Sequence, residues 1–117
     1  MNRDELGRWG EDLAAQHLEA DGMCLLARNW RCAEGEIDIA ATEGGRLVVC
    51  EVKTRSGTGF GSPAEAVTMT KRRRLRRLAQ LFMGQFGHGW VAIRFDVISV
   101  LVRPGEEPEI THLVEAF

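Results

Sequence analysis

The sequence predicts a mixed α/β fold, in which a central β-sheet is flanked by helices. Three observations support this class: a helix-like periodicity at the start, two alternating segments joined by a glycine pair, and a basic helical stretch followed by apolar strands. That order of elements favours a mixed sheet covered by helices. The chain has 117 residues and an apolar fraction of 44%, which is enough for one domain, residues 1–117, with its own core.

The first helix is predicted from about residue 4 to residue 20. Its main apolar stripe contains Leu6, Trp9, Leu13 and His17. Glu11 belongs to a neighbouring row, which it shares with Ala14, Ala15 and Leu18. This row places Glu11 at the edge of the packing face, either as an ordinary solvated glutamate or as an outer acid of a site formed with the next segment.

Two strands are predicted at residues 36–40 and 47–53, because the pair Gly44-Gly45 between them is a strong hairpin signal. A turn centred between those glycines makes one face wholly apolar through the opposed pairs Ile37 with Val52, Ile39 with Cys50 and Ala41 with Val48. The same register places Asp38 opposite Glu51, and Glu36 opposite Lys53, on the other face. Opposed Cβ atoms are about 4.5–5.5 Å apart.

The opposed carboxylates of Asp38 and Glu51 indicate a metal site. Two carboxylates at that distance raise each other's proton affinity unless a cation lies between them. Mg²⁺ prefers oxygen ligands and is commonly held by one or two carboxylates together with phosphate oxygens. Lys53, on the same strand face, would orient or deprotonate a water, or stabilise charge on phosphorus. The alternative is a solvated hairpin face on which Glu36 and Lys53 form an ordinary ion pair.

The rest of the chain supplies two helical segments and further strands. Ser62-Pro-Ala-Glu65 is a capping box that predicts a helix start, and a second helical stretch runs from about residue 70 to residue 83. The apolar face of that stretch contains Leu75, Leu78, Ala79 and Phe82. Strands are predicted at residues 91–102, with an interruption near Asp96, and at residues 110–114. Asp96 is expected to make a structural hydrogen bond, with the basic helix as its proposed partner.

Basic residues are concentrated in the middle of the chain. The net charge is −2, yet residues 46–77 carry nine cations against two acids, a local charge of +7 that leaves −9 elsewhere. Six of these cations begin the second helical stretch: Lys71, Arg72, Arg73, Arg74, Arg76 and Arg77. They oppose the helix dipole, and a phosphate backbone would offset that cost. The cluster predicts nucleic-acid binding, with Arg55 as a further contact, or alternatively a solvated or acid-paired basic face.

Six blocks of the sequence occur in an order that is more specific than any single motif. They are Gly7-Arg-Trp-Gly-Glu11, Asn29-Trp-Arg31, Gly35-Glu-Ile-Asp-Ile-Ala40, Val49-Cys-Glu-Val-Lys-Thr-Arg55, Phe60-Gly-Ser-Pro-Ala-Glu-Ala66 and Arg94-Phe-Asp-Val97. Together they resemble the YraN-like family of uncharacterised bacterial proteins. Glu65 fits either a block of this family or the local helix cap.

The YraN-like family is similar to restriction-endonuclease-like nucleases, and especially to archaeal Holliday-junction resolvases, whose sites carry an acid, then Glu-x-Lys, and a helical Glu. The resemblance implies a restriction-endonuclease-like fold, with Asp38 and Glu51 as metal ligands and Lys53 as the catalytic lysine. It implies that Glu11 is the helical acid and a further ligand. Resolvases cut two strands symmetrically, which implies a homodimer.

The leading interpretation is a Mg²⁺-dependent endonuclease of the PD-(D/E)xK type that hydrolyses phosphodiester bonds in DNA, including branched or processed structures, with Mn²⁺ as a second cofactor. One alternative is a non-catalytic nucleic-acid-binding module that uses residues 71–77. Another is an interaction subunit whose basic helix contacts an acidic protein.

The sequence also excludes some classes. It has no apolar signal region and no apolar run that would span a membrane, so a cytoplasmic protein without a membrane partner is expected. Cys24, Cys32 and Cys50 lack metal or redox spacing and are interpreted as reduced. The three histidines have no ligand spacing, and no zinc site is expected.

Overall fold

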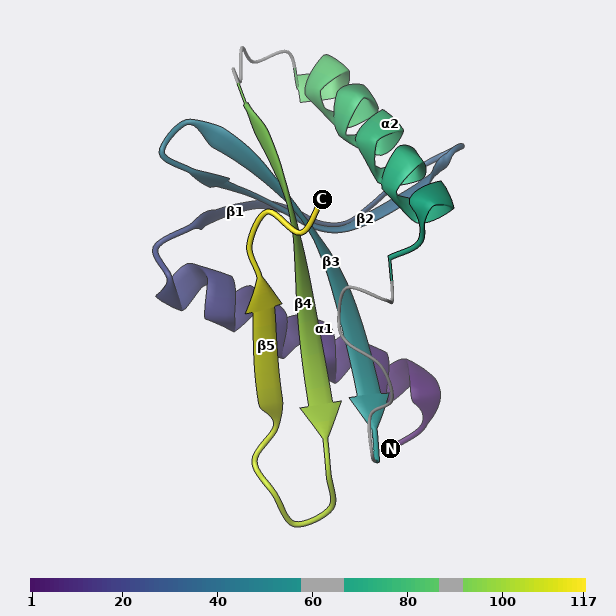
Figure 1. The fold of residues 1–117 in the computed structure, drawn as a ribbon, viewed down its shortest axis with the longest axis vertical. Coiled ribbons are helices and arrows are strands. Elements are labelled where there is room, and N and C mark those ends of the chain that lie inside the picture. Colours follow the sequence, from purple (N-terminus) through teal and green to yellow (C-terminus); the bar gives the residue numbers. More distant parts are fainter. Residues whose placement is uncertain (58–66, 87–91) are drawn as a thin grey trace.

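The computed structural model contains a mixed sheet with a helix on each face (Figure 1). It describes residues 1–57, 67–86 and 92–117. The described elements are α1 (Arg3–Ala20), β1 (Cys24–Cys32), β2 (Gly35–Glu43), β3 (Arg46–Ser56), α2 (Met69–Phe86), β4 (Ile93–Val102) and β5 (Glu109–Leu113). The strands lie side by side in chain order; β3 and β4 are parallel, and the other neighbours are antiparallel. The predicted α/β class is confirmed, and the arrangement is consistent with a restriction-endonuclease-like fold.

Helix α1 packs on one face of the sheet through small residues. It begins with a capping box, in which Asn2 and Glu5 each accept a hydrogen bond from the backbone N–H of the other. Its buried residues are Gly10, Ala14, Ala15 and Leu18. The row beside Glu11 is therefore the most buried one. The predicted main stripe is wrong in this respect, because Leu6, Trp9, Leu13 and His17 are half-buried.

Helix α2 covers the other face, at the end of the sheet where β1 and β2 project (Figure 1). Its buried residues are those predicted: Leu75, Leu78, Ala79 and Phe82. They share a core cluster with Ile37, Val49 and Val97 of the sheet. The ring of Trp30 on β1 meets the ring of Phe82 edge-on, with 5.4 Å between the ring centres. Helix α2 thus packs on the part of the sheet that includes β1 and β2.

Strand β1 is an edge strand that the sequence interpretation did not contain. Strand β4 continues through Asp96 without the predicted interruption, since it pairs with β3 from Ile93 to Val102. The capping box at residues 62–65, with Glu65, lies outside the described residues, as do Val91 and His88. No helix in the described part of the chain is long and apolar enough to cross a membrane.

Candidate metal and nucleic-acid site

The ladder of hydrogen bonds between β2 and β3 ends at Ile39, the residue next to Asp38. It runs from Glu43 opposite Arg46 to Ile39 opposite Cys50, in the predicted register. Beyond this point the backbone N–H of Val52 donates to Oδ2 of Asp38, with 2.8 Å between N and O. The carboxylate of Asp38 therefore occupies the place of a strand partner and lies at the edge of β3, next to Glu51.

Three predicted cross-strand pairs are absent from the ladder: Ile37 with Val52, Glu36 with Lys53, and Asp38 with Glu51. The carboxyl groups of Asp38 and Glu51 interact nonetheless. Near Asp38, β2 no longer pairs with β3 but remains paired with β1, where Glu36 is opposite Arg31. The Nε of Arg31 donates to Oε2 of Glu36 at 3.0 Å. Ile37 lies in the core under α2, whereas Ile39 lies in the core under α1. The alternation of side chains along β2 therefore shifts by one residue at Asp38.

Burial raises the pKa of both carboxyl groups of the acid pair, Asp38 and Glu51. For Asp38, burial and the charge of Glu51 together raise the pKa from 3.8 to about 7, against the hydrogen bond from Val52. For Glu51, burial raises the pKa, and the positive charges of Lys71 and Lys53 act against the rise. The Nζ of Lys71 lies 4.0 Å from Oε1 of Glu51. The folded protein therefore favours a proton on this pair, and a bound cation would favour the charged form.

The acid pair has the donor chemistry of a site for a hard divalent cation. Both residues offer carboxylate oxygens, which Mg²⁺ prefers, and Mg²⁺ is commonly bound by one or two protein carboxylates while it keeps several waters. Among the residues that the structure describes, no three His, Cys, Asp or Glu side chains form a group that could hold a metal ion. Glu11 therefore does not join Asp38 and Glu51 in a three-ligand group here, and the pair would supply two ligands.

Glu11 projects from α1 toward β1. Its Oε1 accepts a hydrogen bond from Nδ2 of Asn29 at 2.7 Å, and Nη2 of Arg28 lies 3.4 Å away. The same Arg28 nitrogen donates to Asp12 at 2.6 Å. The side chain of Glu11 is only 13% exposed. This burial and its fixed partner argue against an ordinary solvated glutamate.

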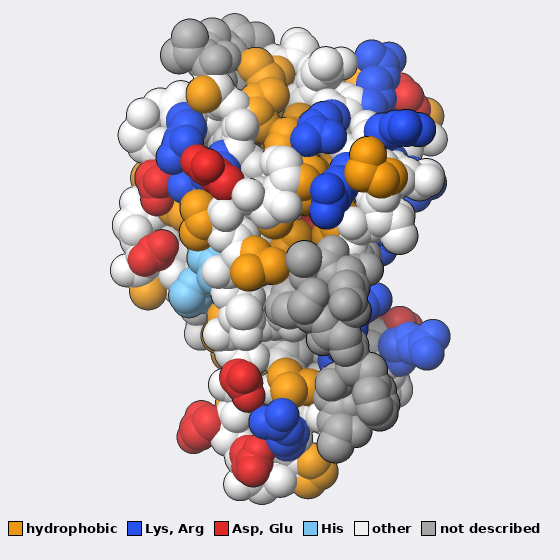
Figure 2. Space-filling model, in the orientation of Figure 1, with side chains coloured by type: hydrophobic (Ala, Val, Ile, Leu, Met, Phe, Trp, Pro, Cys, Tyr) orange, Lys and Arg blue, Asp and Glu red, His pale blue; other side chains and the backbone are white. Residues whose placement is uncertain are grey.

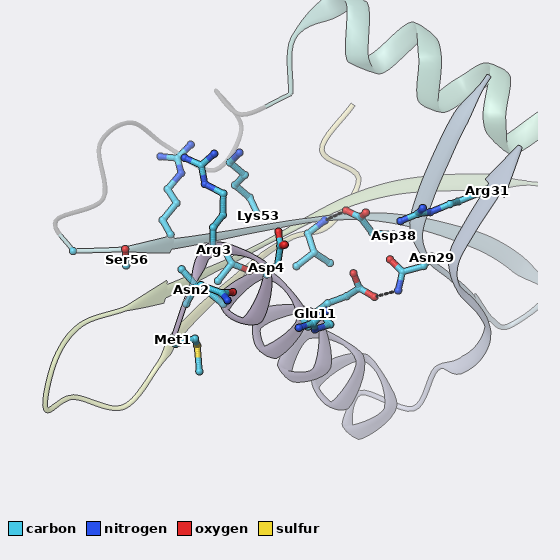
Figure 3. A pocket seen from close by; sticks show the side chains of 17 residues that line it. Met1, Asn2, Arg3, Asp4, Glu11, Asn29, Arg31, Asp38, Lys53 and Ser56 are labelled. Carbon is cyan, nitrogen blue, oxygen red and sulfur yellow. Dashed lines mark hydrogen bonds between the residues drawn. The ribbon is translucent and has the colours of Figure 1, made fainter. Parts of the chain in front are cut away.

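Glu11, Asp38 and Lys53 line one groove, with a volume of about 1550 Å³, between the first turns of α1 and the end of β3. Its lining contains five cations: Arg3, Arg8, Arg31, Lys53 and Arg55. In Figure 3, Asp38 lies between Lys53 on one side and Arg31 on the other, with Glu11 hydrogen-bonded to Asn29 nearby. Acidic groups flanked by cations have the charges that a site for a metal ion and a phosphate group would need.

Glu51 lines a second, smaller cavity of about 250 Å³ between β2 and α2. Its other polar lining residues are Glu36, Asp38, Lys71 and Arg74. Asp38 borders this cavity and the groove alike. The acid pair therefore lies at the boundary of two hollows, and α2 contributes cations to the second.

Several cations of α2 contact other groups of this chain. The guanidinium carbon of Arg76 lies 5.5 Å from the ring centre of Phe117, and that of Arg72 lies 5.4 Å from the same ring. The Nε of Arg77 donates to Glu34 at 3.3 Å. Figure 2 shows Lys and Arg side chains over α2 with hydrophobic side chains between them. The alternative of a basic face with partners in this chain therefore holds for part of the cluster, and nucleic-acid binding by the cluster stays a prediction.

Asp96 belongs to a buried network, and its predicted link to the basic helix is wrong. Its carboxylate accepts hydrogen bonds from Nε and Nη2 of Arg94, each at 2.8 Å, and from the backbone N–H of Glu115 at 3.1 Å. Nε2 of His112 lies 2.7 Å from Asp96, and Nδ1 of His112 lies 3.1 Å from Nε2 of His17. Burial alone would raise the pKa of Asp96, but the bonds from Arg94 and His112 outweigh it and lower that pKa. The structural role is supported, with partners on β4, β5 and α1.

Sequence reasoning assigned no role to Asn29 or to three of the groove cations, Arg3, Arg8 and Arg31. The arginines are far apart in the sequence, so no cluster marked them. Asn29 carried one signal: it is an asparagine inside a strand, a residue type that is enriched at left-handed backbone positions. Without β1 in the interpretation, that signal had no context.

Comparison with known proteins relates the whole chain to one family. Residues 10–100 match the Uncharacterised protein family UPF0102. A curated relative named UPF0102 protein, from Acidothermus cellulolyticus, is 50% identical over 125 residues, which cover 98% of this chain and 95% of the relative. The chain belongs to this family. Another UPF0102 protein, from Nocardia farcinica, is 52% identical over 116 residues, which cover 99% of this chain and 91% of the relative. The resemblance to the YraN-like family is confirmed, and the UPF0102 name states no activity.

Proposed function

We propose that this UPF0102 protein is a metal-dependent endonuclease that hydrolyses phosphodiester bonds in DNA, with branched or processed structures as substrates. The observation that carries the proposal is the acid pair of Asp38 and Glu51. These two partly buried carboxyl groups have raised pKa values and lie where a cation-lined groove meets a second cavity. Perturbed acids in a cleft are a frequent mark of functional sites.

In this proposal Asp38 and Glu51 hold Mg²⁺ or Mn²⁺. Such an ion, when bound, lowers the pKa of a coordinated water and stabilises negative charge on the scissile phosphate. Lys53 lines the groove beside Asp38 and supplies a positive charge for a phosphate oxygen or for the attacking water. Glu11, fixed by Asn29, presents an outer carboxylate that accepts a hydrogen bond from water in the groove.

The groove cations are the first place where the nucleic-acid backbone would bind. Arg3, Arg8, Arg31 and Arg55 line the same groove as Asp38, so phosphates bound there would lie beside Asp38. Lys71 and Arg74 of α2 lie beside the second cavity, on the far side of that pair. Of the six predicted α2 contacts, these two are the best placed for the scissile region.

A non-catalytic nucleic-acid-binding module is the second candidate. It is favoured by the concentration of cations on α2, which does not depend on the acids. A homodimer remains part of the proposal through the resemblance to resolvases.

A cleavage assay with matched variants separates the two functions. We expect Asp38→Asn and Glu51→Gln to abolish Mg²⁺-dependent cleavage while DNA affinity persists, and Lys53→Ala to lower the rate with metal affinity largely kept. Glu107→Gln makes the same acid-to-amide change at an exposed position in the β4–β5 connection and should leave cleavage unchanged. The substrates should include four-way junctions, flaps, nicked duplex and single strands. If the wild type binds these DNAs but cleaves none of them in Mg²⁺ or Mn²⁺, the binding module is the correct function.

A further inference from the structure

We propose that Asn29 is a positioning residue of the proposed metal site: its backbone places the ligand Asp38, and its side chain holds Glu11 as an outer acid. The inference rests on the proposed metal site. Asn29 lines the groove beside both acids. It is one of two residues other than glycine that have a positive φ among those described, at 51°.

The backbone of Asn29 explains why Asp38 leaves the regular alternation of β2. The pairs on either side, Arg28 with Ile39 and Trp30 with Ile37, place Asn29 opposite Asp38. Arg28 and Asn29 both contact Glu11 of α1, whereas Trp30 packs against α2, so the alternation of β1 shifts at Asn29.

The alternation of β2 shifts at the opposite position, Asp38, since Ile39 and Ile37 lie in different cores. A left-handed residue in a strand re-aims the side chains around it. The paired shifts turn the carboxylate of Asp38 toward the N–H of Val52 on β3, 2.8 Å away.

The side chain of Asn29 fixes the outer acid, Glu11. Its Nδ2 donates to Oε1 of Glu11 at 2.7 Å, a bond from a neutral donor that holds the carboxylate without neutralising it. Asparagine is also one of the few residues that enter the left-handed region readily, because its short polar side chain tolerates that conformation. Glycine would keep the backbone without the donor. Aspartate would tolerate the backbone but present an acceptor and a negative charge to Glu11.

The test uses Asn29→Asp and Asn29→Gly, because both retain access to the left-handed backbone. Mn²⁺ affinity is measured by calorimetry, and folding by the urea midpoint. We expect urea midpoints close to the wild-type value and a loss of Mn²⁺ affinity of about 10- to 100-fold, the usual effect of removing a hydrogen-bonding group that surrounds the metal ligands. Glu115→Gly is the matched control, since Glu115 has a φ of 52° in the C-terminal segment, and it should keep wild-type Mn²⁺ affinity.

Each outcome decides between the two claims. Wild-type Mn²⁺ affinity in both Asn29 variants would overturn the positioning role and leave the proposed nuclease intact. A drop in the urea midpoint with unchanged Mn²⁺ affinity would show that Asn29 acts on folding alone and would also overturn it. No Mn²⁺ binding by the wild type would refute the metal site itself, and the positioning role with it.

Discussion

The proton on Asp38 makes the stability of this protein depend on pH. In the folded state the pKa of Asp38 is about 7, whereas the unfolded chain has the ordinary value of 3.8. Between these values the folded state binds more protons than the unfolded state. The free energy of unfolding therefore falls as the pH rises from about 4 to about 7, because the folded protein must accept an unfavourable buried charge.

Asp38→Asn should remove this pH dependence. The amide oxygen still accepts the hydrogen bond from Val52, and no charge develops. We expect the variant to be more stable than the wild type at pH 8 by on the order of 1 kcal/mol, or several degrees in Tm, and nearly equal to it at pH 4. Thermal melts across this pH range, without divalent metal, measure the difference. A variant that melts below the wild type at pH 8 would mean that the ionised carboxylate is stabilised in the fold.

At the scale of elements, the contact between α1 and β3 holds the helical acid near the sheet. A Cβ at position 10 would collide with the side chain of Thr54, so only glycine allows this approach. Gly7 lies one turn earlier on the same helix, where a Cβ would meet nothing within 4 Å. Helix α1 therefore contains one glycine with no room for a side chain, Gly10, and one with open space beside it, Gly7.

Alanine substitutions at these two glycines should have opposite signs. Gly10→Ala should destabilise the protein by about 1–3 kcal/mol, because the added methyl overpacks the helix against β3. Gly7→Ala should stabilise it by roughly 0.5–1 kcal/mol through higher helix propensity. Urea unfolding of both variants gives the comparison. If Gly10→Ala is as stabilising as Gly7→Ala, α1 does not approach β3 as closely as described.

The hairpin shows how far sequence patterns predict this fold. Apolar alternation gave the correct register from Ile39 to Glu43, because Ile39, Ala40 and Ala41 are buried within it. The pattern failed at Ile37, where the left-handed Asn29 on the neighbouring strand shifts the alternation. Strand β1 was missed because the alternation of its exposed and half-buried residues is also interrupted at Asn29. A single left-handed residue on a neighbouring strand leaves no periodic pattern in the sequence of β2.

The candidate site was also predicted only in part from the sequence. Asp38, Glu51 and Lys53 are close along one hairpin, so their sequence spacing was sufficient to bring them together. A partner of Glu11 and one partner of Asp96 come from distant segments, Asn29 on β1 and His112 on β5. Such contacts depend on how whole elements pack, which local spacing does not contain.

On the scale of the whole molecule, cations flank the acid pair from two directions, although the net charge is −2. Arg3, Arg8 and Arg31 line the groove. On α2, Arg72 and Arg76 lie over an aromatic ring and Arg77 contacts Glu34. Cations held by internal contacts have less freedom to follow a phosphate backbone. Such contacts hold all three of these α2 arginines, and in the groove they hold Arg31 through Glu36, so the groove should dominate nucleic-acid binding through Arg3 and Arg8.

The salt dependence of DNA affinity tests whether the groove cations contribute more to DNA binding than the α2 cations. Replacing Arg3, Arg8 and Arg31 with Gln should flatten the slope of log K against log salt by about 0.9 for each phosphate that the protein no longer neutralises. Replacing Arg72, Arg76 and Arg77 with Gln makes the same charge change and should flatten it less. Fluorescence anisotropy over a salt series measures both slopes. The opposite ranking would place the DNA along α2 and not in the groove.

The central claim is that Asp38 and Glu51 together bind a divalent cation, and calorimetric titration tests it without knowledge of the substrate. Metal binding requires ionised carboxylates, so it must displace the proton that the raised pKa of Asp38 retains. Titrations of Mn²⁺ at pH 6, in buffers with different ionisation enthalpies, should show release of about one proton per metal bound by the wild type, with the release fading above pH 8. Asp38→Asn should bind far more weakly and release none. No binding heat in the wild type, or equal binding by Asp38→Asn, would contradict the claim.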